Sequence, residues 1–155
     1  MPSTSFGLVT PLERRWISEF AQRSKVSFSL LRNNSVTLGE VKQLLDAEVL
    51  VGEDKLDMEV KTAFGADLMS DVLAFAKPGS LLLTGLTNPQ VIRTSDILDI
   101  AAIIMVRGKQ PSPESLRLAR ELHIPILVTK YILFETAGKL YLKGIVGCLE
   151  KVENR

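Results

Sequence analysis

Three uninterrupted hydrophobic stretches dominate the second half of the chain. They span residues 80–84, 101–106 and 126–129 and are rich in Leu, Ile and Val. A strand that faces water on one side alternates between hydrophobic and polar residues, and these stretches do not. The pattern is typical of parallel strands buried on both faces. We therefore expect the three strands to lie side by side in the interior of a sheet.

A short polar loop and a helix are expected after each of these strands. The loops are residues 85–89, 107–111 and 130–131. Asn88 or Thr87 is placed to cap a helix that opens at Pro89, and Ser112 to cap one that opens at Pro113. A third helix is expected over 132–143. Its core-facing stripe is predicted to comprise Leu133, Ala137, Leu140 and Tyr141.

Shorter elements are predicted before this repeat. Thr37 and Glu40 have the spacing of a capping box and predict a helix that ends near Asp46. A small strand is expected at 49–51 and a further strand over 58–64. Ser70 and Asp71 are expected to cap a helix over 72–76, which the Pro-Gly pair at 78–79 ends.

These elements predict an α/β fold. We expect a mostly parallel sheet of four to five strands with helices on both faces, formed by residues 35–150. Residues 1–34 are predicted to be an amino-terminal helical extension, with a helix over 11–23 whose apolar stripe includes Trp16 and Phe20.

The composition narrows the function classes. The 155 residues carry 19 basic and 18 acidic side chains, so a net charge of +1 provides no field for nucleic acid or anionic lipid. Cys148 is the single cysteine and cannot form an internal disulfide. No secretory signal and no apolar stretch long enough to span a membrane is found. We expect a cytoplasmic protein without a membrane partner.

The polar residues that follow the strands are the candidates for binding a ligand. Glycine at 85 permits close approach of the backbone, and Arg107 directly follows a strand, so this edge could hold a phosphate or carboxylate. The structural alternative is that Gly85 only makes the turn and Asn88 only caps its helix. The candidate ligand-binding residues are Thr84, Gly85, Thr87, Asn88, Arg93, Arg107, Gly108 and Thr129.

Other reactive residue types have simpler explanations. His123 is expected at a helix-to-strand turn at the opposite end of the sheet, and Cys148 as a small, partly buried apolar residue. Asp67 and Asp71 could form a paired carboxylate site, although helix capping accounts for Asp71. No catalytic residue, metal ligand or cofactor is predicted.

Several of these segments together resemble the DRTGG domain. They are residues 66–74, 83–91, 102–111, and 124–129 with 134–137, and the similarity extends over about 35–147. The sequence lacks an Asp-Arg pair after the first strand, and Val106-Arg107-Gly108 stands where Thr-Gly-Gly is usual. The resemblance implies an accessory α/β domain that occurs alone or fused to phosphate acetyltransferases, regulated inorganic pyrophosphatases and cobyrinic-acid-synthase-like proteins. It also implies a fold similar to the amino-terminal domains of HPr kinase and the Mur ligases.

Two hypotheses on function follow. The first is a non-enzymatic regulatory module that binds a small anionic metabolite or nucleotide at loops 85–89 and 107–111. The alternative is a protein-interaction or assembly module without a small-molecule ligand. A homodimer is expected, with the Trp16 and Phe20 face as the candidate interface.

Overall fold

The computed structural model describes residues 11, 15 and 35–153. Positions 11 and 15 are helical and exposed. The rest of the helix expected over 11–23, including Trp16 and Phe20, lies outside the described residues. The fold below is that of residues 35–153, which belong to one of the two units into which the chain divides.

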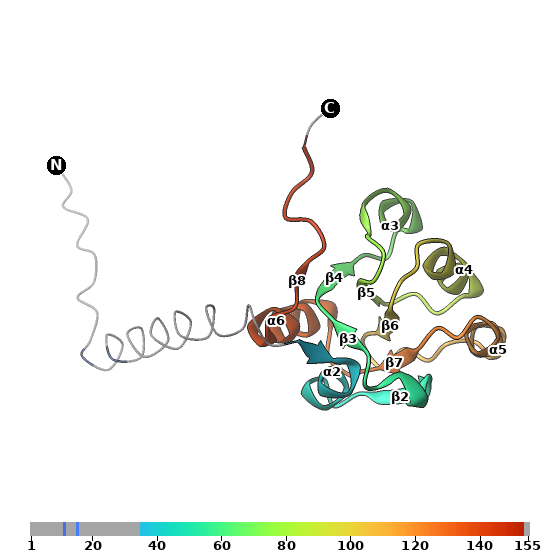
Figure 1. Cartoon of the computed structure of the whole chain (residues 1–155), viewed down its shortest axis with the longest axis horizontal. Helices are drawn as coiled ribbons and strands as arrows, with labels where there is room; N and C mark the ends of the chain where they lie inside the picture. Colours follow the sequence, from blue (N-terminus) through green and yellow to red (C-terminus); the bar gives the residue numbers. More distant parts are fainter. Residues whose placement is uncertain (1–10, 12–14, 16–34, 154–155) are drawn as a thin grey trace. The chain divides into compact units, whose positions relative to one another are not determined.

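Three parallel strands form the interior of a six-stranded sheet (Figure 1). They are β5 (Leu81–Thr84), β6 (Ala102–Met105) and β7 (Ile126–Val128), which pair in the order β7-β6-β5. All of their residues are buried. The prediction of contiguous, buried parallel strands is confirmed.

Three further strands complete this sheet in the order β2-β7-β6-β5-β4-β8. Strand β4 (Thr62–Gly65) is parallel to β5, and β8 (Val146–Gly147) is parallel to β4. Strand β2 (Glu48–Val51) is antiparallel to β7 at the other edge. The mostly parallel α/β class is confirmed, and β8 raises the strand count to six because a two-residue strand leaves no periodic signal in the sequence.

A second, two-stranded antiparallel sheet joins β1 (Val36–Thr37) to β3 (Glu59–Val60). The single strand expected over 58–64 is therefore wrong. The extended segment is interrupted at the exposed Lys61. As a result, β3 and β4 are separate strands that pair with different partners. Alternation along a sequence does not reveal such a change of partner.

Helices cover both faces of the large sheet (Figure 1). On one face, α2 (Leu38–Leu44) and α6 (Leu133–Lys143) pack on a core that includes Leu81, Leu83 and Ile104. On the other, α3 (Met69–Phe75), α4 (Pro89–Ile97) and α5 (Pro113–Glu121) pack on a core that includes Leu82, Ile103 and Met105. A short 3₁₀ helix, η1 (Glu53–Lys55), follows β2. Adjacent positions of one strand thus serve opposite cores, which explains the unbroken apolar runs.

The predicted helix caps are largely confirmed. The Glu40 amide donates to Thr37 Oγ1 at 3.2 Å, and the Thr37 amide donates to Glu40 Oε2 at 2.9 Å, which is a complete capping box. Asn88, rather than Thr87, caps α4, because its Oδ1 accepts from the Val91 amide at 3.4 Å. Ser112 caps α5.

Two helix predictions are wrong in detail. Helix α3 begins at Met69 after Leu68 and has no side-chain cap, so Ser70 and Asp71 lie inside its first turn. Helix α6 buries Thr136 and Leu140, whereas Ala137 and Tyr141 are exposed. The buried face of α6 contains a threonine, and its exposed face contains apolar residues. A prediction based on hydrophobicity alone therefore assigned Ala137 and Tyr141 to the wrong face.

In the described part of the chain, no helix has the length and apolar character needed to cross a membrane.

Candidate functional site

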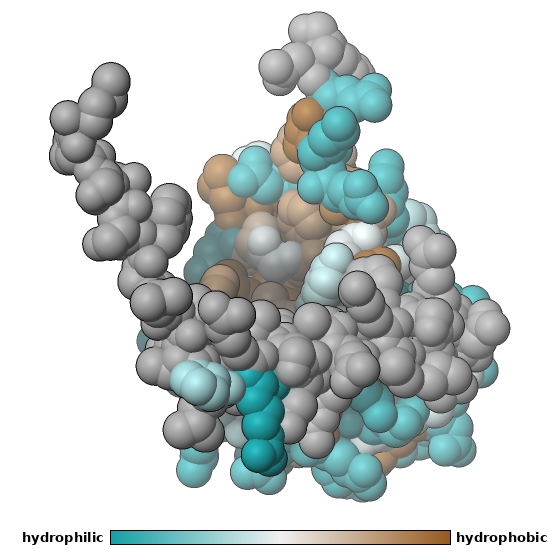
Figure 2. All heavy atoms as spheres, turned by 90° about the vertical axis from the view of Figure 1, so that its left-hand side faces the viewer, coloured by the Kyte–Doolittle hydropathy of each residue, from teal (hydrophilic) through white to brown (hydrophobic). Residues whose placement is uncertain are grey.

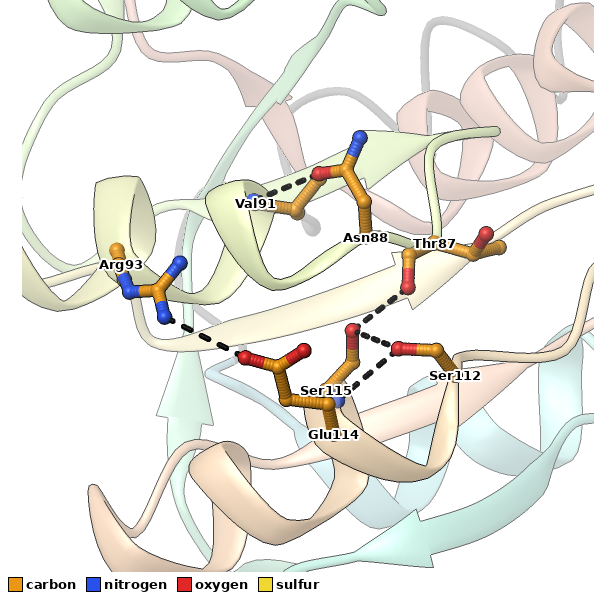
Figure 3. A network of polar contacts seen from close by, with 7 residues as sticks. All are labelled: Thr87, Asn88, Val91, Arg93, Ser112, Glu114 and Ser115. Atoms are coloured by element: carbon orange, nitrogen blue, oxygen red, sulfur yellow. Dashed lines mark hydrogen bonds and ion pairs between the residues drawn. The ribbon is translucent and has the colours of Figure 1, made fainter.

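The loops at the carboxyl ends of β5, β6 and β7 are joined into one cluster by hydrogen bonds. The amides of Arg107 and Gly108 donate to the carbonyls of Tyr131 and Thr129 at 2.9 and 2.8 Å. The Thr87 carbonyl accepts from the Ser112 amide at 3.3 Å and from Ser115 Oγ at 2.7 Å. Figure 3 shows the second of these links, with Ser115 reaching from α5 to the loop before α4. The structure therefore brings all three predicted loops together.

Asp67 holds the first loop, and sequence reasoning missed this role. Its Oδ1 accepts from the Gly85 amide at 2.7 Å and from Thr84 Oγ1 at 3.0 Å. Thr84 Oγ1 in turn accepts from the Leu86 amide at 3.2 Å. The position of Asp67 in the sequence could have revealed this role. Asp67 lies two residues after β4, a fourth parallel strand whose carboxyl end lies at the same edge of the sheet. The Asp67 carboxylate thus accepts the hydrogen bond of the Gly85 amide, in a loop that was expected to bind a ligand.

Arg107 is placed against Gly85. A Cβ atom at Gly85 would collide with the Arg107 guanidinium, so glycine is what permits this close approach. Arg107 has a φ of 60°, in the left-handed region, and Gly108 follows with a φ of 65°. The aliphatic stem of Lys130 lies next to Gly108, 4.0 Å from where its Cβ would be. Arg107 and Lys130 are exposed, so two cations border this edge.

Two candidate residues are engaged elsewhere. Arg93 Nη2 lies 3.6 Å from Glu114 Oε1 and links α4 to α5 (Figure 3). Both side chains are more than half exposed, at 56% and 55%, so the pair contributes little stability. Thr129 is buried; its hydroxyl donates to the Leu45 carbonyl at 2.7 Å and accepts from the Tyr131 amide. Thr129 therefore ties β7 to the end of α2.

Three backbone donors remain open in the loops after β5 and β6. Within residues 35–153, the amides of Thr87, Asn88 and Gln110 donate no hydrogen bond to the protein. They belong to the same loops as Gly85 and Arg107. Free amides beside exposed cations can bind an anionic oxygen, and the nearby Asp67 carboxylate opposes a second negative charge. The arrangement has donors for one anionic group in these two loops.

Unlike Asp67, His123 and Cys148 do not join this cluster. His123 is exposed at the turn between α5 and β7, as expected. The Cys148 thiol is half-buried and lies 3.7 Å from the Phe75 carbonyl. Among the described residues, no group of three or more His, Cys, Asp or Glu side chains has the arrangement of a metal site.

Comparison with known proteins supplies the family. The DRTGG domain model matches residues 40–142, which is more than half of the chain. An uncharacterized protein of Bacillus subtilis, YtoI, is 28% identical over 136 residues, covering 86% of this chain and 29% of its own length. The chain thus spans less than a third of that curated relative.

A solved structure has a similar fold. It contains the CBS and DRTGG domains of the regulatory region of Clostridium perfringens pyrophosphatase in complex with an activator, diadenosine tetraphosphate. The TM-score is 0.59 at 19% identity, over 70% of this chain and 47% of that one. The family match and this shared fold agree, and the chain belongs to the DRTGG domain family.

Proposed function

We propose that this chain is a non-catalytic regulatory module that binds a small anionic metabolite or nucleotide at the loops after β5 and β6. The observation that carries the proposal is the placement of the Arg107 guanidinium against Gly85, which lies in the same loop as the open amides of Thr87 and Asn88. A guanidinium and backbone amides are the donors that proteins use for phosphate and carboxylate oxygens.

The backbone of Arg107 supports a functional role for its side chain. A non-glycine residue in the left-handed region costs about 1–2 kcal/mol, and glycine would remove that cost. Among the described residues, the other non-glycine positions with positive φ are Asp46, Asp99 and His123, and each follows the end of a helix, where this conformation is common. Arg107 instead follows a strand, at the binding edge. Strained residues concentrate at sites where the side chain has a task.

Asp67 defines which donors a ligand would meet. Because its carboxylate already accepts from the Gly85 amide, the anion is expected on the side of Thr87, Asn88 and Gln110. Electrostatic repulsion from Asp67 would disfavour a second phosphate on the Gly85 side.

The fold similarity sets the range of ligands to test. The similar solved chain is part of a regulatory region whose complex contains diadenosine tetraphosphate, and at 19% identity the likeness concerns the fold. Adenosine mono-, di- and triphosphate, diadenosine tetraphosphate, acetyl phosphate and inorganic phosphate therefore form the screening set.

Calorimetric titration of the full chain tests the proposal. We expect at least one member of the set to bind, and Arg107→Gly to weaken that binding by about 10-fold or more. Arg107→Gly should leave thermal stability unchanged or raised, since it relieves the left-handed strain. Arg117→Ala, which removes an exposed arginine in the middle of α5, is the matched control and should bind normally.

Two results would overturn the proposal. One is the absence of heat and of thermal stabilisation with every member of the set at millimolar concentration. The other is binding that Arg107→Gly leaves unchanged.

A further inference from the structure

The outer face of α6 is apolar and exposed. Phe134, Tyr141 and Leu142 are 81%, 52% and 68% exposed, and Ala137 and Gly138 between them are exposed as well. A side chain at Gly138 would meet nothing within 4 Å. Figure 2 shows the side of the domain that lies to the left in Figure 1, with hydrophobic surface below the C-terminal tail.

Helical geometry centres this face on Gly138. At about 100° per residue, Gly138 lies opposite the buried side chains of Thr136 and Leu140. Phe134 and Tyr141 then flank Gly138 on one side, one turn before and one turn after it. Glu135, Lys139 and Leu142 lie on the other side. The face is thus a shallow hollow with a large side chain at each end.

We propose that this face binds a second copy of the chain, with the two α6 helices packed antiparallel across a two-fold axis at Gly138. That axis places Phe134 of one copy against Tyr141 of the second copy, on one side of the hollow. On the other side it places Leu142 of one copy beside the stem of Glu135 of the second copy. Both relations hold reciprocally, so the face complements itself in shape, as a two-fold interface requires.

The small residue at the axis sets the approach of the helices. Glycine at a crossing point allows an interaxial distance at the short end of the usual 8–10 Å. The two aromatic pairs would then gain offset or edge-to-face contacts. A leucine or phenylalanine at position 138 would hold the backbones apart. The absence of a side chain here is therefore an advantage in a dimer, whereas in an isolated helix glycine only costs stability.

The size of the face fits a modest dimer. Together with Ile132 before α6, the three large side chains expose roughly 500 Å². Val146 on the edge strand β8 extends the apolar surface. The total approaches the roughly 800 Å² per partner of a standard interface. By contrast Ile97 on α4, although 73% exposed, is an isolated residue of the kind that needs no partner.

Light scattering and sedimentation equilibrium of the full chain at tens of micromolar test the inference. We expect a dimer of the 17.1 kDa chain. Phe134→Glu should raise the dimer dissociation constant about 30-fold or more, as loss of an interface hot spot does. Ile97→Glu, the matched control, should leave the dimer intact.

Gly138→Leu separates dissociation from misfolding. Its side chain enters open space in a single copy and favours the helix, so the monomer should melt at the same or a higher temperature when dilute. The same leucine should block the dimer. A wild-type chain that stays monomeric would overturn the inference, and would leave residues 1–34 or a different protein as the partner of this face. So would a dimer that survives both Gly138→Leu and Phe134→Glu.

Discussion

Removing the Asp67 carboxylate is the sharpest test of how the binding edge is held. In Asp67→Ala, the Gly85 amide and the Thr84 hydroxyl both lose their acceptor. Thr84 and Gly85 are buried, so water replaces that acceptor poorly. The loop that positions Gly85 against Arg107 should loosen as a result.

The expected cost follows from these two bonds. A hydrogen bond to a charged group contributes about 1.5–3 kcal/mol, and a buried donor left unsatisfied costs about 1–3 kcal/mol. Asp67 itself is exposed, which places its contribution at the low end. We therefore expect a loss of about 1–2 kcal/mol in the free energy of unfolding. For a chain of this size that corresponds to a fall in Tm of about 3–8 °C.

Urea and thermal unfolding followed by circular dichroism measure this loss. Asp71→Ala is the matched control, because Asp71 is an exposed aspartate in the first turn of α3, four residues after Asp67, and its carboxylate takes no part in the loop bonds. It should cost less than about 0.5 kcal/mol. Asp67→Asn keeps an acceptor without the charge and should fall between the two. If Asp67→Ala melts like Asp71→Ala, the carboxylate does not hold the loop and the argument fails.

Three other perturbations have defined outcomes. Ile104→Asp should unfold the domain, because an unpaired carboxylate on a fully buried strand costs several kcal/mol of the roughly 5–15 available; a cooperative melt of the soluble variant would contradict this. Arg93→Ala should change unfolding free energy by less than about 0.5 kcal/mol, since its pair with Glu114 is half exposed, and a larger loss in urea would refute it. The Thr37 amide holds the pKa of Glu40 below its ordinary value of 4.5, so this contribution is complete above pH 4.5 and is lost as pH falls through the depressed pKa. Glu40→Gln should therefore show a shallower loss of stability below pH 4.5, and an unchanged acid limb would contradict the assignment.

The sheet interior and the crossover helices were predictable because their signals are local. A strand buried on both faces is apolar along nearly all of its length, as β5, β6 and β7 are, with Thr84 at the end of β5 as their one polar residue. The caps at Thr37, Asn88 and Ser112 depend on groups three residues apart, so their spacing in the sequence is enough to find them.

The errors arose where long-range pairing decides the outcome. Strands β3 and β4 differ in partner, and a single exposed residue at Lys61 separates them. On α6, both faces carry apolar residues, so periodicity could not tell Leu140 inside from Tyr141 outside. That ambiguity is itself informative, because a helix that is apolar on its outer face has a reason to bind something.

The grouping of the candidate loops at one edge of the sheet could be predicted from the sequence, whereas the contacts of their side chains could not. Parallel topology brings the loops after β5, β6 and β7 together, which the strand order alone implies. The Asp67 contact depends on β4 pairing beside β5, and the bond between Thr129 and Leu45 joins residues 84 positions apart. The conformation of Arg107 depends on the Tyr131 carbonyl that receives its amide, which the sequence does not reveal.

The central claim is that the loops after β5 and β6 form the binding edge of this domain. Two-dimensional amide NMR of the labelled chain, titrated with adenosine diphosphate and with diadenosine tetraphosphate, tests it most directly. The account predicts saturable shifts for the amides of Thr87, Asn88, Arg107 and Gln110, lost in Arg107→Gly and retained in Arg117→Ala. Shifts confined to the opposite end of the sheet, where Lys55 bonds to the His123 carbonyl, would contradict it. So would spectra that neither ligand changes at millimolar concentration.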